Sequence, residues 1–387
     1  MRLGGLCTGV AVAALVAGCS TTSNSTTTAA AGPGGRLTVY ASVPTQQADV
    51  YSGEKLALTQ GGDKVGAFTI ALRQLPAADS FKQITDNART AISDTSTIAY
   101  LGEGVPGTSG YSVPITNELG ILEVSPTDNA LELVEGSPVL PESRKSLYYP
   151  SQSTYGYTFG RVVPSATNEA AALVSEMQAL KVTKLYVTSQ PLPCTDGDVS
   201  GCYGKAIAKA VATDAAQKSI AVSSTPSGAD GAFIGTNDPA YAATTFGALS
   251  SSDPSIKLFG PSPLDTSTFT PSDERNVYIS APGVMQMPPA FVSAFKSAYG
   301  HTPTPQALFG DLAMTALLDA LRQAGGSADN RTAVISDYFS LRNRTSPLGS
   351  FTINPRTGEI QLPTPTLVIN RFRAGQLVPF TAPSTLG

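Results

Sequence analysis

The stretch from Ile98 to Asp128 constrains the fold of this chain more than any other. Its apolar run Ile98–Leu101 stops at Gly102 and is typical of a buried strand. A glycine-rich loop follows, and residues 111–119 then favour a short helix that a glycine ends. Ile121–Val124 is a second apolar run. The pattern predicts a strand, a loop, a helix and a parallel strand, which is the repeating unit of α/β proteins.

Small hydroxyl residues stand where both of these strands end. Thr108 and Ser109 lead into the predicted helix, and Ser125 and Thr127 follow the second strand. In open α/β sheets, ligands bind outside the carboxyl ends of the strands. A loop that enters a helix also offers free N–H groups and a positive dipole end, which suits a carboxylate.

The order of motifs in this stretch resembles the leucine/isoleucine/valine-binding branch of the type 1 periplasmic binding proteins. That branch has a strand leading into Gly-…-Ser-Gly, a helix with Pro-Ile and Gly-Ile, and then Ser-Pro. This chain has the same elements in the same order: Gly102, Ser109-Gly110, Pro114-Ile115, Gly120-Ile121 and Ser125-Pro126. Further matches run from about Leu37 to Phe380 and include Phe159 to Ser165, Tyr203-Gly204, Ala232 to Gly235, Tyr278 to Pro282 and Ala294 to Gly300.

The resemblance implies an α/β fold of two doubly wound, largely parallel lobes joined by three hinge crossovers, which close on a ligand. The alternation of strand and helix patterns agrees with this architecture. The chain is also longer than a single hydrophobic core usually supports, which favours two lobes. We expect residues 36–157 and 283–347 in the first lobe, and residues 158–282 and 348–387 in the second.

The ligand residues of the family can be placed only where its motifs match. The resemblance implies that Thr108, Ser109 and Gly110 hold a ligand carboxylate and that Ser125 and Thr127 form a second binding loop. It adds Tyr203 and Thr236 from the second lobe. The alternative for the hydroxyl residues is that they cap helices and turns, and the alternative for Tyr203 is packing.

One departure from the family concerns the ligand ammonium. In its amino-acid receptors an acid follows the strand that resembles Lys257–Gly260, whereas this chain has Ser262 there. A buried ammonium without a partner is costly. Either another acid replaces it or the ligand lacks an α-ammonium, so we expect weak binding of leucine, isoleucine and valine. The candidate acids by loop position are Asp128, Asp311, Asp196 and Asp198; Asp311 is alternatively a helix N-terminal charge.

The N-terminus predicts export. Arg2 precedes a short apolar run to Ala17, typical of a secretory signal and too short to span a membrane. Residues 15–19 resemble a bacterial lipobox, which implies a signal peptide of residues 1–18 and a lipid on Cys19 that anchors the chain to the outer face of the membrane. The alternative is ordinary cleavage near Ala17. Residues 19–35 are mostly Ser, Thr, Ala and Gly and predict a flexible tether.

Cys194 and Cys202 remain in the exported chain, and oxidising surroundings favour a disulfide between them. The alternative is a metal site that they form with Asp196 and Asp198. The chain has one histidine, His301, which argues against a His-based triad or a multi-histidine zinc site. We expect no metal and no cofactor. The net charge of −4 offers no basic field for nucleic acid.

These expectations describe a receptor and not an enzyme. The resemblance implies a lipid-anchored solute-binding protein that carries a small carboxylate-bearing or amino-acid-like metabolite to the permease and ATPase of an ABC importer. A ligand sensor of the same fold is the alternative, because fold alone does not separate the two. An exported hydrolase is disfavoured because the sequence has no Gly-x-Ser-x-Gly elbow.

Overall fold

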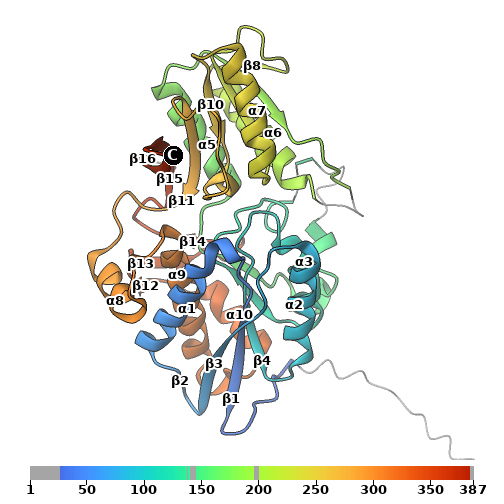
Figure 1. Ribbon diagram of the computed structural model, residues 1–387. Helices are drawn as coiled ribbons and strands as arrows, with labels where there is room; N and C mark the ends of the chain where they lie inside the picture. The colour runs from blue at the N-terminus through green and yellow to red at the C-terminus, as the bar shows by residue number, and fades with distance from the viewer. Residues whose placement is uncertain (1–26, 137, 140–144, 196–199, 384–387) are drawn as a thin grey trace, which may run out of the picture.

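A computed structural model describes residues 27–136, 138–139, 145–195 and 200–383 of the chain (Figure 1). The signal segment, Cys19, Asp196 and Asp198 therefore lie outside the described residues. Two lobes are visible in Figure 1, each built on its own sheet. The expected α/β architecture of two lobes is confirmed.

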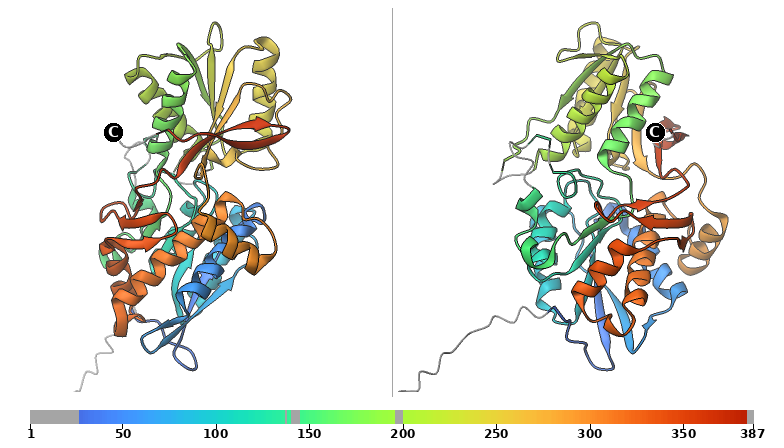
Figure 2. Two further views of the ribbon diagram at one scale, coloured as in Figure 1. Left: turned by 90° about the vertical axis from the view of Figure 1, so that its left-hand side faces the viewer. Right: turned by 180° about the vertical axis from the view of Figure 1, so that it is seen from behind.

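The first lobe contains a six-stranded sheet in the order β2-β3-β1-β4-β5-β6, parallel except for the β2–β3 pair. Its strands are β1 (Arg36–Ala41), β2 (Lys64–Val65), β3 (Phe68–Gln74), β4 (Thr97–Leu101), β5 (Leu122–Ser125) and β6 (Phe159–Arg161). Its helices are α1 (Ala48–Gly61), α2 (Phe81–Ser93), α3 (Ser109–Glu118), α4 (Gln152–Tyr155), α8 (Pro289–Tyr299), α9 (Pro305–Ala324) and α10 (Arg331–Ser340). Figure 2 shows α8, α9 and α10 beside the N-terminal strands, although they come late in the chain.

The second lobe contains a seven-stranded sheet in the order β16-β15-β11-β10-β9-β7-β8. Its strands are β7 (Lys184–Ser189), β8 (Ala221–Ser223), β9 (Gly231–Gly235), β10 (Lys257–Gly260), β11 (Val277–Pro282), β15 (Leu367–Arg373) and β16 (Gln376–Thr381). Its helices are α5 (Ala166–Ala179), α6 (Cys202–Gln217) and α7 (Pro239–Ser252). The last two strands run antiparallel to their neighbours, and the others are parallel.

Three segments connect the sheets: residues 162–165, 283–288 and 362–366. The first crossing comes later than the expected boundary at residue 158, because β6 pairs in parallel with β5 and so belongs to the first sheet. The third also comes later than residue 348. The small sheet of β12 (Arg344–Ser346), β13 (Gly349–Ile353) and β14 (Ile360–Gln361) buries Phe351 and Ile353 in the first-lobe core.

The last crossover also changes a pairing that the sequence suggests. The turn at residues 355–358 predicts a hairpin between residues 351–354 and 366–373. Instead β13 pairs with β14, while β15 leaves for the second lobe and pairs with β11 and β16. The tight turn is real, but it joins β13 to a strand of two residues.

Helices α1 and α9 form the closest helix pair of the first lobe. A Cβ atom added to Gly53 would lie 1.9 Å from the carbonyl oxygen of Ala307, and one added to Gly310 would lie 2.1 Å from that of Val50. No side chain fits at either position, so the two glycines set the separation of the helices. This contact fixes the start of α9, from which Gln306 points to the second lobe.

The predicted tether is shorter than residues 19–35, because residues 27–35 pack on the first lobe. The N–H of Ala29 donates to the carbonyl of Asp329 at 2.7 Å, and the N–H of Arg331 donates to that of Thr27 at 2.7 Å. Ala29 is also part of the first-lobe core. In the described part of the chain, no helix combines the length and the apolar composition needed to cross a membrane.

The expected disulfide between Cys194 and Cys202 is confirmed. It closes a loop just before α6, so that Cys202 is the first residue of that helix. Among the described residues, no group of three His, Cys, Asp or Glu side chains is placed to hold a metal ion.

Replacing both Cys194 and Cys202 by serine should lower the free energy of unfolding by about 2.5 kcal/mol, the entropic value for so short a loop. Urea unfolding of the parent and the double variant measures this difference. Non-reducing peptide mapping of the exported protein should recover the two cysteines as one linked pair. Two freely alkylated thiols would contradict the pairing.

Candidate functional site

A cleft of about 1140 Å³ lies between the two lobes. On the first lobe it is lined by the segments that follow β1, β3, β4 and β5, including Thr45, Ser80, Thr108 and Thr127. On the second lobe the loops after β9, β10 and β11 contribute, together with β15. The cleft therefore lies at the carboxyl ends of parallel strands in both lobes, where ligands bind in open α/β sheets.

Two side-chain hydrogen bonds join the lobes across this cleft. The amide of Gln306, in the first turn of α9, donates to Asp265 Oδ2 at 3.1 Å. The hydroxyl of Thr266 donates to Gln46 Oε1. Both second-lobe partners belong to the loop after β10, so this loop contacts the first lobe across the cleft.

The residues expected to bind a ligand fall into two groups. Thr108, Thr127 and Ser262 line the cleft. The others do not contribute to its lining: Ser109, Gly110, Ser125, Asp128, Tyr203, Thr236 and Asp311. Polar groups of Ser109, Ser125, Asp128, Tyr203 and Thr236 bond to other parts of the protein.

Asp128 fills the donor positions of the loop after β4. Its carboxylate accepts hydrogen bonds from the backbone N–H groups of Gly107 and Ser109, each at 2.8 Å, and from that of Ala130 at 3.0 Å. Asp128 is fully buried. Desolvation raises the pKa of its carboxyl, and the three N–H donors counteract part of this rise. Of the three residues expected to hold a ligand carboxylate, Ser109 thus donates its N–H to a carboxylate of the protein itself.

The neighbouring hydroxyls hold the backbone of the same loop. Ser125 Oγ donates to the carbonyl of Glu103 at 2.6 Å, and Ser109 Oγ accepts from the N–H of Glu103 at 3.1 Å. Thr127 Oγ1 donates to the carbonyl of Gly104. The Glu103 carboxyl is buried, accepts bonds from Tyr100 and Ser42, and has its pKa raised by burial to about 8. These contacts fix the loop conformation and match the capping role weighed above.

Glu169, in the first turn of α5 in the second lobe, is likewise a buried carboxylate that accepts several hydrogen bonds. One carboxylate oxygen accepts from the N–H of Ser262 at 2.6 Å and from the hydroxyl of Ser280 at 2.5 Å. The other accepts from the amide of Asn129 and, at 3.3 Å, from the hydroxyl of Tyr203. Tyr203 therefore bonds to Glu169 and is fully buried within the second-lobe core. From the sequence alone, Glu169 is recognisable only as an acid in the first turn of a helix.

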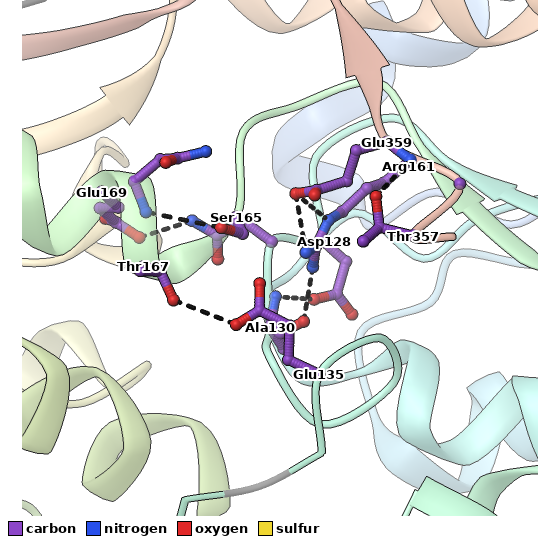
Figure 3. A network of polar contacts seen from close by, with 12 residues as sticks. Asp128, Ala130, Glu135, Arg161, Ser165, Thr167, Glu169, Thr357 and Glu359 are labelled. Atoms are coloured by element: carbon purple, nitrogen blue, oxygen red, sulfur yellow. Dashed lines mark hydrogen bonds and ion pairs between the residues drawn. The ribbon is translucent and has the colours of Figure 1, made fainter. Parts of the chain in front are cut away.

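Arg161, at the end of β6 and just before the first crossover, binds Glu359 in the segment between β13 and β14, as Figure 3 shows. Its guanidinium donates to Glu359 from two nitrogens, at 2.9 and 3.1 Å, and to the carbonyl of Ala130 at 2.6 Å. Arg161 is completely buried. Because Ala130 also donates to Asp128, this network links the hinge to the loop that Asp128 holds.

Thr236 and Asp311 serve local structure. The hydroxyl of Thr236 donates to Gln190 at 2.7 Å and accepts from the N–H of Asp238, the residue that caps α7. Asp311 lies in the second turn of α9 and not at its start. Desolvation raises the pKa of Asp311 to about 7, and its backbone N packs against Gly53 of α1.

Asp265 is an acid of the cleft wall that was not among the residues expected from the sequence. It stands three residues after Ser262, beyond the 3-10 turn at Ser262–Leu264, and lines the cleft. Its Oδ1 accepts from the amide of Asn370 at 3.0 Å, and its Oδ2 from that of Gln306. Burial raises the pKa of Asp265 to about 6. A search of the sequence for an acid within one short turn of Ser262 would have identified Asp265.

Comparison with solved structures shows the same fold in solute-binding proteins. A leucine-binding protein from Thermotoga maritima MSB8 aligns with a TM-score of 0.69 and 15% identity, over 89% of this chain and 98% of that one. An ABC transporter substrate-binding protein from Desulfitobacterium hafniense in complex with Leu aligns with 0.67 and 17%, over 89% and 100%. A solute-binding protein from R. palustris in complex with benzoate aligns with 0.64 and 15%, over 89% and 95%.

These likenesses show that the chain has the type 1 periplasmic binding protein fold, which confirms the resemblance seen in the sequence. No family model and no curated protein sequence matches the chain.

Replacing Asp128 by alanine should lower the free energy of unfolding by about 3 kcal/mol, because three buried N–H donors lose a charged acceptor. Millimolar formate should restore stability to this variant in a saturable way, since a small carboxylate can take the vacated position. Thermal unfolding with formate or with chloride at equal ionic strength measures the effect.

The matched control is Asp63→Ala, at an exposed position of the same lobe, which should unfold like the parent with either salt. Equal stabilisation of Asp128→Ala by formate and chloride would mean that the loop does not bind carboxylates.

Proposed function

We propose that this chain is an exported solute-binding receptor that traps a small molecule between its lobes and delivers it to an ABC importer. The observation that carries the proposal is the interlobe cleft at the carboxyl ends of both sheets, where side chains of two loops and one helix start form hydrogen bonds between the lobes. The three crossovers permit the lobes to move about a common hinge. Lobe closure then reports the bound state to a permease without any chemical step.

The proteins of similar fold support this role, because they include a leucine-binding protein and solute-binding proteins of ABC transporters in complex with Leu and with benzoate. The volume of the cleft lies above the usual range for a small-molecule site, in keeping with a cleft that is still open to solvent. Cys19 supplies the anchor in this proposal, and the residues between Cys19 and the docked segment at residue 27 supply the spacer.

The test is the identification of a retained solute. Protein purified without denaturation from its own host should carry a small molecule that native mass spectrometry detects and that denaturation releases in a ratio of about one per chain. The same molecule, added back to stripped protein, should raise the unfolding temperature. A stripped protein that no solute from host extract or growth medium stabilises would contradict the receptor role.

Replacing Cys19 by serine should move the protein from the membrane fraction to the soluble exported fraction, because multiple acyl chains on one cysteine provide the membrane affinity. Fractionation and immunoblotting measure the distribution. Cys7→Ser is the matched control, because Cys7 lies within the predicted signal and should leave membrane retention unchanged. Full membrane retention of the Cys19 variant would rule out the lipid anchor.

A further inference from the structure

The charged side chains that line the cleft are all acidic. Asp79, Asp265 and Glu274 line it, and within the described residues of the lining there is no lysine, arginine or histidine. Asp79 is held by the N–H and the hydroxyl of Thr45, and Asp265 by two neutral amides. No protein cation compensates either carboxylate among these contacts. The cleft therefore attracts positive charge and repels an anion.

Asn370 adds a second acceptor beside Asp265. Its Nδ2 must face the Asp265 carboxylate, which accepts hydrogen bonds and cannot donate them when ionised. Its Oδ1 then has no hydrogen-bond partner, although the residue is only 5% exposed and lines the cleft. A buried acceptor without a donor costs free energy. The carboxylate and this carbonyl oxygen together present acceptors to a ligand that brings several donors.

The position for a ligand carboxylate is already filled. The Asp128 carboxylate occupies the N–H groups of Gly107 and Ser109, and the Glu169 carboxylate occupies the N–H of Ser262. A ligand carboxylate would have to displace a buried charge of the same sign. The hydroxyls of Thr108 and Thr127 already donate to backbone carbonyls. The Ser262 hydroxyl, which also lines the cleft, has no hydrogen-bond partner, but a single neutral donor does not balance the charge of a carboxylate.

An aromatic face completes the lining on the first lobe. Phe81 lines the cleft, is 42% exposed and stacks on Tyr111 with ring centroids 4.4 Å apart. A large exposed ring beside acidic groups is suited to the apolar part of a cation or to a cation–π contact.

We propose that the solute is a primary amine without a carboxylate, whose ammonium binds between Asp265 and Asn370 of the second lobe. This inference rests on the proposed function and specifies its ligand. It reverses the expectation from the sequence: the ammonium partner is present, displaced to Asp265, and the carboxylate subsite is the one that is lost. Gln306, which bonds Asp265 from the first lobe, connects occupation of this site to lobe closure.

Matched sets of ligands test the inference by calorimetry on stripped full-length exported protein. One set is leucine, its decarboxylated form 3-methylbutylamine and its deaminated form 4-methylpentanoate; another is arginine and agmatine; a third is phenylalanine and 2-phenylethylamine. At least one amine should bind at least tenfold more tightly than its parent amino acid, and the carboxylate without an amine should not bind. Equal or tighter binding of the parent amino acids would overturn the inference.

A variant of Asp265 tests the position of the ammonium. Asp265→Asn should weaken the binding amine at least tenfold, whereas Asp273→Asn, which removes an acid paired with Arg275 outside the cleft, should leave the affinity unchanged. Asn370→Leu should also weaken the amine, since it removes the free acceptor. Unchanged affinity in both cleft variants would place the ammonium elsewhere and overturn the inference.

The Asp265→Asn variant is expected to fold. The raised pKa of Asp265 means that its ionisation opposes folding, so stability from this group is lost as pH rises from about 4 through about 6. An asparagine avoids that cost at neutral pH, and a flip of the Asn370 amide gives the new Nδ2 an acceptor. The variant should therefore melt no lower than the parent at pH 7.5 while its amine affinity falls.

Failure of the inference and failure of the proposed function have different signatures. If no amine binds but native mass spectrometry recovers another solute, the inference falls and the receptor role stands. If neither the amines, the amino acids nor any solute from host extract binds, the receptor role falls with it.

Discussion

The buried Asp128 carboxylate holds the loop on which the first-lobe side of the cleft depends. Three backbone N–H groups converge on it, from both the loop after β4 and the segment after β5. A loop that would otherwise be left with free donors at a helix entrance is thereby closed by the protein itself. This contact gives the loop a fixed shape without a ligand. In the proposed amine receptor, the same contact also occupies donors that a ligand carboxylate would otherwise use.

Two further buried charged groups, Glu169 and Arg161, lie near the segments that connect the lobes. Glu169 accepts donors from four separate segments, and Arg161 links β6 to Glu359 in the segment between β13 and β14. Each group is buried, and each finds several partners, as a buried charge requires. Because Ala130 bonds to both Arg161 and Asp128, the hinge and the cleft loop are parts of one hydrogen-bond network.

The sequence predicted the fold well because the fold is encoded locally. The apolar runs at Ile98–Leu101 and Ile121–Val124 correspond to β4 and β5, which pair in parallel as expected. The lobe boundaries and the last hairpin were less predictable. A strand such as β6 carries no local mark of which sheet it joins, and the partner of β13 depends on where the chain crosses between the lobes.

For the cleft, the sequence by itself indicated some of the loops that line it, those with Thr108, Thr127 and Ser262, since strand ends in a doubly wound sheet gather at one edge. It did not determine which polar groups in those loops remain open. Asp128, Glu169 and Asp265 are ordinary acids in the printed sequence, and only the tertiary structure places two of them on internal donors and the third on the cleft wall. The reason is physical. Whether a carboxylate holds the protein together or faces a ligand depends on the hydrogen-bond donors around it, and these donors come from segments far apart in the chain.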